Sequence, residues 1–241
     1  MTLRYMTRLI RGSIVVVALA FSGCSQGEPA VSRAPSSTSA RGGTSSTAAS
    51  VTSPASLPRI VFLGDSLTAG YGLDVEQAVP SLIQKQLDAA GYTYEVVNAG
   101  VSGDTSAGGL RRLDWSLDGN VRILVIELGG NDGLRGLPVA GMKQNLEAII
   151  RRAKERGIDV LLTGMEAPPN YGPAYTADFR RVFRDLAGEE RVAFMPFFLN
   201  GVAGNPSLNL ADGMHPNPAG AQIVEANVWR TLEPMLDKRA R

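Results

Sequence analysis

The amino-acid sequence predicts an α/β fold: a three-layer α/β/α sandwich around a flavodoxin-like, five-stranded parallel sheet with the strand order 2-1-3-4-5. Beyond Leu57, short apolar runs alternate with longer amphipathic stretches. The runs are apolar throughout, as is typical of strands that are covered on both faces. Strands that alternate with helices in this way favour a parallel sheet with helices on both sides.

The elements of this fold can be placed in order along the chain. The predicted strands are Arg59–Leu63, Tyr94–Asn98, Val121–Leu128, Asp159–Thr163 and Arg191–Phe194. The predicted helices are Val75–Ala90, Ala107–Leu117, Val139–Arg156, Ala174–Ala187 and Pro218–Leu236. Helix start and stop signals support two of these helices, because Gly91 follows the first, Pro138 opens the third and Gly157 closes it. The elements together predict one domain over residues 58–241.

The first 23 residues have the pattern of a secretory signal peptide. A basic start with Arg4, Arg8 and Arg11 is followed by an apolar run and a small-residue site. The run is shorter than the ~20 residues that span a bilayer, although an uncleaved N-terminal anchor is the alternative. The segment 21–24 resembles a bacterial lipobox, with Phe where Leu is usual, so Cys24 is the candidate for lipidation. A chance cysteine at the end of an ordinary signal sequence is the other interpretation.

Residues 24–57 are nearly all Ser, Thr, Ala, Gly or Pro. Such a composition buries too little apolar surface to offset the entropy of ordering, so it predicts a flexible linker. The linker would join a membrane anchor to the domain.

Charge and composition exclude several classes of function. The formal net charge is +1, so there is no basic excess to neutralise a nucleic-acid backbone, and we expect no nucleic-acid partner. The chain has one Cys and one His, which excludes an intramolecular disulfide and argues against a His/Cys zinc site. Any chemistry that needs an imidazole must therefore use His215.

Polar, Gly-rich segments follow the first three predicted strands, at residues 64–72, 99–106 and 127–133. With the order 2-1-3, these segments lie side by side at the carboxyl ends of the strands, where ligands bind in such sheets. A fourth polar segment, residues 211–217, precedes the last helix. Each segment alone could be a turn or a helix cap. Their joint occurrence predicts an active site.

The residues in these segments suit nucleophilic catalysis. Ser66 is the candidate nucleophile, His215 the base and Asp212 the carboxylate that orients the base. Hydrogen-bond donors for the oxyanion would be the N–H groups of Ser66 and Gly103 and the side-chain amide of Asn131.

The same segments resemble the four blocks of the SGNH/GDSL hydrolase superfamily. The matching residues are Gly64-Asp65-Ser66-Leu67, Gly103, Gly129-Gly130-Asn131-Asp132 and Asp212-Gly213-Met214-His215-Pro216. The resemblance covers Pro58 to Leu236, and within the superfamily it is strongest to the bacterial thioesterase I/lysophospholipase/arylesterase group. It implies a serine esterase that forms an acyl-enzyme on Ser66, with the predicted sandwich fold and with no metal or organic cofactor.

The resemblance also implies small esters, thioesters or lysolipids as substrates. One wall of the acyl site would carry Leu134 and Leu137, and the other Met165, Pro168, Pro169 and Tyr171. With the signal peptide, this predicts an exported enzyme of the cell envelope or periplasm, attached to the membrane through Cys24.

Three other functions are possible for a chain with these motifs. Other branches of the superfamily are carbohydrate O-deacetylases. A surface lipoprotein could use the fold only for binding, although it would have no need to keep all the site residues together. A nucleotide-binding domain is disfavoured, since the chain lacks a GxxxxGK[ST] phosphate loop and a dinucleotide fingerprint. The sequence carries no signature of an oligomeric state.

Overall fold

Five parallel strands form one sheet in the order β2-β1-β3-β4-β5, which confirms the predicted topology. The computed structural model describes residues 56–237. The predicted signal peptide, Cys24 and all but the last two residues of the predicted linker lie outside the described residues. The strands are β1 (Arg59–Gly64), β2 (Glu95–Gly100), β3 (Val121–Glu127), β4 (Asp159–Thr163) and β5 (Ala193–Met195).

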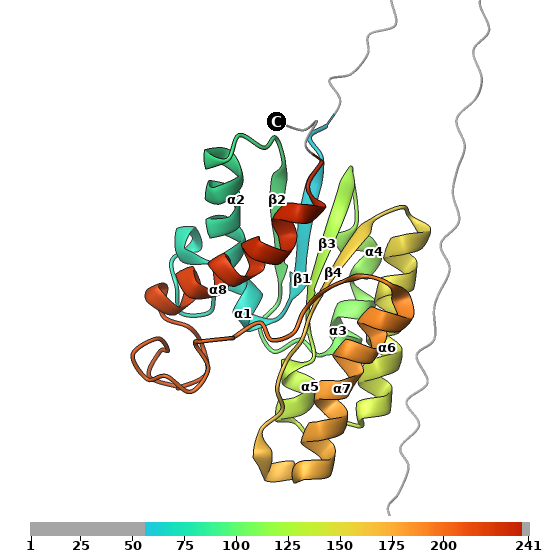
Figure 1. Cartoon of the computed structure of the whole chain (residues 1–241), viewed down its shortest axis with the longest axis vertical. Coiled ribbons are helices and arrows are strands. Elements are labelled where there is room, and N and C mark those ends of the chain that lie inside the picture. Colours follow the sequence, from blue (N-terminus) through green and yellow to red (C-terminus); the bar gives the residue numbers. More distant parts are fainter. Residues whose placement is uncertain (1–55, 238–241) are drawn as a thin grey trace, which may run out of the picture. The chain divides into compact units, whose positions relative to one another are not determined.

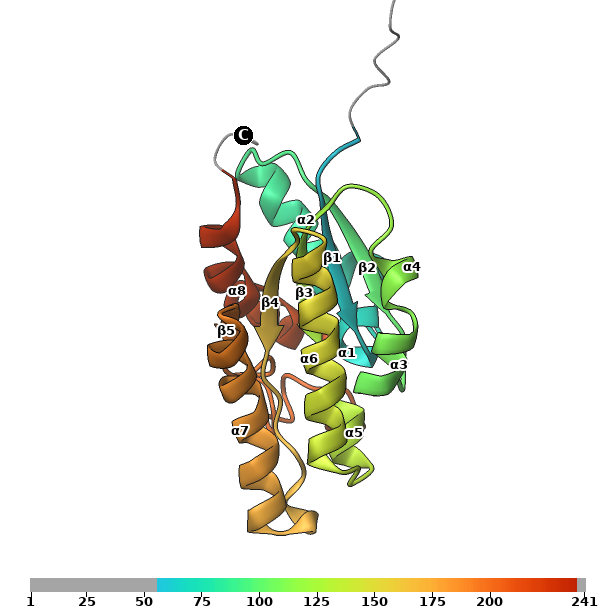
Figure 2. The ribbon, with the colours of Figure 1, turned by 90° about the vertical axis from the view of Figure 1, so that its right-hand side faces the viewer.

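Helices cover both faces of the sheet, as Figures 1 and 2 show. On one face lie α2 (Val79–Ala89) and α8 (Pro218–Leu232), which pack against each other. The other face is covered by α3 (Ser106–Arg111), α4 (Leu113–Ser116), α6 (Val139–Glu155) and α7 (Pro173–Glu190). The remaining elements are short: α1 (Ser66–Ala69), α5 (Gly130–Leu134), η1 (Val75–Gln77), η2 (Pro169–Tyr171) and η3 (Glu233–Met235).

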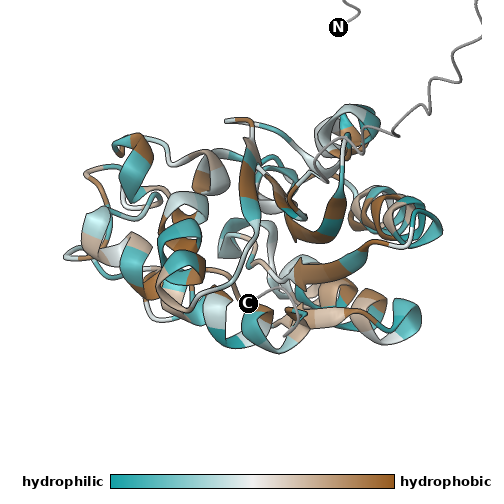
Figure 3. Cartoon of the chain, turned by 90° about the horizontal axis from the view of Figure 1, so that it is seen from above, coloured by the Kyte–Doolittle hydropathy of each residue, from teal (hydrophilic) through white to brown (hydrophobic). Residues whose placement is uncertain are grey.

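The hydrophobic core lies between the sheet and its two helical layers. The strands β1 and β3 are almost completely buried, and Ile60, Phe62 and Leu124 have no exposed surface. Each long helix turns one apolar face to the sheet, for example through Leu146 and Ile150 of α6. Figure 3 shows hydrophobic residues on the central strands and hydrophilic ones on the outward sides of the helices. Within residues 56–237, no helix combines the length and the apolar character that a bilayer crossing requires.

Two predicted helices are broken in the structure. The stretch 107–117 divides into α3 and α4 at Arg112, whose side chain turns back to the strand ends. The stretch 75–90 divides into η1 and α2 at Ala78, which is extended. Pro80 fits the first turn of α2 because the N–H groups of that turn have no partner within the helix. Both breaks lie next to the loops that build the site.

The parallel register brings the predicted polar segments together. Gly64, at the end of β1, pairs with Gly100 at the end of β2 and with Glu127 at the end of β3. The loops that follow these three strands therefore start at the same edge of the sheet, as the sequence predicts. The loops at this edge of the sheet thus supply three of the four polar segments that were predicted to form the site.

Candidate active site

Ser66 lies in a tight turn at the end of β1, as the first residue of α1. Asp65 caps this helix, because its Oδ1 accepts a hydrogen bond of 3.0 Å from the N–H of Leu67. The turn requires glycine at position 64, since a Cβ there would lie 2.0 Å from Oγ1 of Thr68. The hydroxyl of Ser66 is thereby held at the wall of an open cavity.

His215 and Asp212 come from the loop between β5 and α8. The carbonyl oxygen of His215 accepts a hydrogen bond of 2.7 Å from the N–H of Leu210, which closes the loop. Oδ1 of Asp212 accepts the N–H groups of Met214 at 2.9 Å and of His215 at 3.0 Å. One carboxylate oxygen therefore fixes the loop, and the other remains available for the imidazole.

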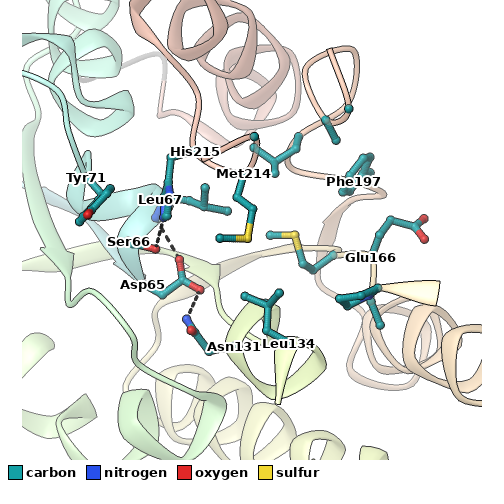
Figure 4. Close-up of a pocket in the computed structure, with 18 of the residues that line it drawn as sticks. Asp65, Ser66, Leu67, Tyr71, Asn131, Leu134, Glu166, Phe197, Met214 and His215 are labelled. Carbon is teal, nitrogen blue, oxygen red and sulfur yellow. Dashed lines mark hydrogen bonds between the residues drawn. The ribbon is translucent and has the colours of Figure 1, made fainter. Parts of the chain in front are cut away.

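Ser66, His215 and Asp212 form a continuous chain of hydrogen bonds, although Ser66 and His215 are 149 residues apart in sequence. Nε2 of His215 lies 2.8 Å from Oγ of Ser66, and Nδ1 lies 2.7 Å from Oδ2 of Asp212. Figure 4 shows Ser66 and His215 pointing toward each other at the cavity wall. This is the geometry of a nucleophile, a base and an orienting acid.

The charge state of Asp212 suits this arrangement. The backbone N–H groups of His215 and Met214, together with the imidazole, lower the pKa of Asp212 to about 2. The carboxylate is therefore ionised at neutral pH and can favour the tautomer of His215 that carries its proton on Nδ1.

The predicted oxyanion donors converge on the same cavity. Ser66, Gly103 and Asn131 all line it. Asn131 lies in α5, and its Nδ2 donates to Oδ2 of Asp65 at 3.0 Å, which leaves the second amide hydrogen for a ligand. Gly103 has a φ of 83°, a left-handed conformation that glycine adopts without strain, and its carbonyl accepts from Arg135.

Arg112 ties the loop of Gly103 to the sheet. Its guanidinium donates to the carbonyl oxygens of Ala99 at 2.6 Å and Gly64 at 2.8 Å, and to the carboxylate of Asp104 at 2.6 Å. These three acceptors lie at the ends of β1 and β2 and beside Gly103. A single side chain therefore fixes the relative positions of two loops.

Two buried acids lie beneath the nucleophile turn. Asp65 is 2% exposed and Glu127 is fully buried. Burial raises the pKa of Asp65 and, with the charge of Asp65 nearby, raises the pKa of Glu127 well above its ordinary value. These acids therefore differ sharply from the exposed Asp212.

The cavity beside Ser66 has a volume of about 660 Å³, within the usual range for small-molecule sites. Most of its wall is apolar. Of the predicted pocket residues, Leu134, Met165, Pro168 and Pro169 line it, whereas Leu137 and Tyr171 do not. The hydroxyl of Tyr171 instead donates to the carbonyl of Leu134 at 3.0 Å, so Tyr171 contacts a residue of the wall without lining the cavity.

Several residues of the site were not predicted from the sequence. Tyr71 packs on the imidazole of His215 with ring centroids 4.6 Å apart, and Met214 and Phe197 line the cavity. Tyr71 and Met214 lie inside the polar segments 64–72 and 211–217, so their neighbours in sequence could have pointed to them. Phe197 and Leu199 follow β5 in an irregular stretch without such a signal.

Comparison with known proteins agrees with this geometry. The model of the GDSL-like lipase/acylhydrolase family matches residues 62–223. Esterase TesA of Pseudomonas aeruginosa is 47% identical over 187 residues, which cover 77% of this chain and 93% of that protein. The thioesterase 1/protease 1/lysophospholipase L1 of Escherichia coli K12 is 36% identical over 74% of this chain and 85% of its own length.

A solved structure gives the same result in three dimensions. The crystal structure of TesA superimposes with a TM-score of 0.71 and 48% sequence identity, covering 74% of this chain and 99% of that one. The predicted fold and the predicted class of ester hydrolase are confirmed. The chain belongs to the GDSL-like lipase/acylhydrolase family.

Proposed function

We propose that this ester hydrolase cleaves carboxylic esters and thioesters through an acyl-enzyme on Ser66. The observation that carries the proposal is the hydrogen-bond chain from Oγ of Ser66 through His215 to Asp212, with distances of 2.8 and 2.7 Å, at the wall of an apolar cavity. An unassisted serine hydroxyl is a poor nucleophile, and this chain supplies the base that it needs.

In the first half-reaction, Nε2 of His215 takes the proton of Ser66 as Oγ attacks the carbonyl carbon of the substrate. The tetrahedral oxyanion accepts hydrogen bonds from the N–H groups of Ser66 and Gly103 and from the amide of Asn131. His215 then protonates the leaving alcohol or thiol, and Asp212 stabilises the imidazolium that exists in between.

In the second half-reaction, water replaces the leaving group. His215 takes a proton from the water, which attacks the acyl carbon, and the same donors hold the second oxyanion. Collapse of that intermediate breaks the bond to Oγ, returns the proton to Ser66 and releases the carboxylic acid. No cofactor is needed at any step.

The cavity supports acyl chains as the preferred part of the substrate. Leu134, Met165, Pro169 and Phe197 give apolar surface to the cavity that Ser66 also lines, and the close-up shows Met214 across the cavity from Leu134. Apolar surface buried by an acyl chain stabilises binding by roughly 25 cal/mol per Å². Small aryl or alkyl esters, lysolipids and acyl thioesters all present such a group.

The hydrolysis of p-nitrophenyl esters of increasing acyl length, by the full chain, tests this function. Activity should disappear in Ser66→Ala, whereas Ser81→Ala, a change in α2, should leave it unaltered. A fluorophosphonate probe should label the wild type and the control but not Ser66→Ala. Equal labelling of all three would disprove the role of Ser66.

We further propose that the enzyme acts outside the cytoplasm, held to a membrane by a lipid on Cys24. The basic and apolar start and the lipobox-like segment at 21–24 support this proposal. Feeding a fatty-acid analogue to producing cells should label the wild type, while Cys24→Ser should remain unlabelled and leave the membrane fraction. Equal recovery of both proteins in membranes, without label, would contradict the proposal.

A further inference from the structure

Glu127 is a fully buried acid for which the serine mechanism has no use. It ends β3 and lies opposite Gly64, the residue that precedes the nucleophile turn. A Cβ at Gly64 would lie 2.8 Å from Oε2 of Glu127, so the absence of a side chain there leaves room for the carboxyl group. The sheet thus places an acid directly beneath the turn that carries Ser66.

The contacts of Glu127 suit a neutral carboxyl group better than a carboxylate. Its Oε2 accepts the hydroxyl of Thr68 at 2.9 Å and the N–H of Asp65 at 3.3 Å. Within the described residues, Oε1 has no hydrogen-bond partner, and no Lys or Arg forms an ion pair with Glu127. A buried carboxylate without such partners is costly, and protonation removes most of that cost.

The ionisable groups around Glu127 agree with this assignment. The carboxyl group of Asp65 faces it, and His215 acts on Asp65 from the cavity side. The guanidinium of Arg112 reaches the carbonyl of Gly64 nearby, but its other bonds go to Asp104 and to a backbone carbonyl. The ionisable group that faces Glu127 is therefore an acid rather than a base.

Asp65 connects the two parts of the site that must act together. Its Oδ1 holds the N–H of Leu67 in the nucleophile turn, and its Oδ2 holds the amide of Asn131, as the dashed lines in Figure 4 show. A shift of this carboxylate would move Ser66 and the oxyanion amide at once. Whatever fixes Asp65 therefore fixes the geometry of the reaction.

We propose that Glu127 is a positioning residue whose protonated carboxyl group donates a hydrogen bond to the carboxylate of Asp65 and so fixes both Ser66 and Asn131. This inference rests on the proposed function and names a further residue that it requires. Burial raises the pKa of both acids, and the hydrogen bond between them opposes this rise at Asp65 and adds to it at Glu127, so the proton stays on Glu127. A neutral Glu127 also keeps a second negative charge away from the developing oxyanion.

The test compares Glu127→Gln with Glu127→Leu in the full chain. Glutamine can donate to Asp65 and accept from Thr68 as the protonated acid does, whereas leucine fills the space without hydrogen bonds. We expect kcat of the Gln variant to stay within about threefold of wild type. The Leu variant should lose about 10²-fold in kcat, the cost of a small misplacement of reacting groups, with little change in KM.

The pH profile gives a second, independent result. In the wild type, kcat should fall at alkaline pH as Glu127 ionises, and this fall should be absent in the Gln variant, which cannot ionise. A Gln variant as inactive as the Leu variant would overturn the proposal, because it would mean that the carboxylate form is needed. Wild-type kcat in the Leu variant would overturn it as well.

Infrared spectroscopy measures the proton without relying on activity. The difference between wild type and Glu127→Gln at neutral pH should contain the C=O band of a protonated carboxyl group. Absence of this band would overturn the proposal even if the Leu variant did not fold. If instead the wild type neither hydrolysed esters nor took up a fluorophosphonate but showed the band, the proposed function would fail, and the protonation of Glu127 would stand.

Discussion

Asp212 and Asp65 are two aspartates of one site, and their surroundings give them opposite properties. Asp212 lies in an exposed loop, where two backbone N–H groups and an imidazole lower its pKa to about 2. Asp65 lies almost completely buried beneath Ser66, where burial raises its pKa despite hydrogen bonds from Leu67 and Asn131. The same side chain serves as an ionised partner of His215 in one place and as part of a buried acid pair in the other.

The number of hydrogen-bond donors and the loss of solvent therefore decide the charge of an acid more than its distance from the reacting atoms does. In the loop, solvent and backbone donors together favour the carboxylate. Under the turn, solvent is absent and the nearest ionisable group is another acid, Glu127.

Asp212→Asn should lower kcat by about 10⁴-fold, because an amide no longer favours the tautomer of His215 that can take the serine proton. The geometry would stay nearly intact, since one side-chain oxygen could still accept the two backbone N–H groups. Steady-state kinetics with a p-nitrophenyl ester would measure the loss. A decrease of less than tenfold would mean that Asp212 only shapes its loop.

Asn131→Ala should lower kcat by about 10²- to 10³-fold, the usual effect of removing one oxyanion donor. KM should change little, because the lost hydrogen bond forms mainly in the transition state. Asn145→Ala, in α6, removes an amide that instead donates to Ser106 and does not line the cavity, and it is the matched control. Equal effects of the two substitutions would argue against an oxyanion role for Asn131.

The contributions of Asp212 and Glu127 to stability should depend on pH in opposite directions. The folded-state pKa of Asp212 is lowered, so its contribution to the free energy of unfolding is present above the unfolded value of 3.8 and is lost as pH falls through about 2. The folded-state pKa of Glu127 is raised above 4.5, so its contribution is complete below that value and is lost as pH rises through the raised pKa.

Urea unfolding of wild type, Asp212→Asn and Glu127→Gln over a range of pH would measure this difference. Relative to Asp212→Asn, the wild type should lose stability toward low pH. Relative to Glu127→Gln, it should lose stability toward high pH. Parallel curves for all three proteins would contradict both pKa directions.

Leu134→Ala should raise KM for long-chain esters by about three- to tenfold and leave kcat nearly unchanged. The effect is modest because the half-exposed side chain of Leu134 can bury only part of its apolar surface against an acyl chain. Leu137→Ala is the matched control, since Leu137 has similar exposure but does not line the cavity. Short-chain esters should be affected less by either change. A larger effect at position 137 than at 134 would place the acyl chain elsewhere.

The sequence alone predicted the strand order and the family, both of which are confirmed, and it indicated Ser66, Asp212 and His215 as the reacting residues of the site. Apolar runs of strand length indicated the sheet, and polar segments after three of them indicated the edge where Ser66, Gly103 and Asn131 meet. The single histidine left one choice of base, His215.

Only the tertiary structure decided how these residues are held. The break of the second predicted helix at Arg112 depends on three acceptors from two strand ends, which no local pattern reveals. Leu137 and Tyr171 have the apolar character of pocket residues, but neither lines the cavity, and the hydroxyl of Tyr171 instead donates to the carbonyl of Leu134. The buried pair of Asp65 and Glu127 depends on strand register and loss of solvent, which are properties of the packed fold.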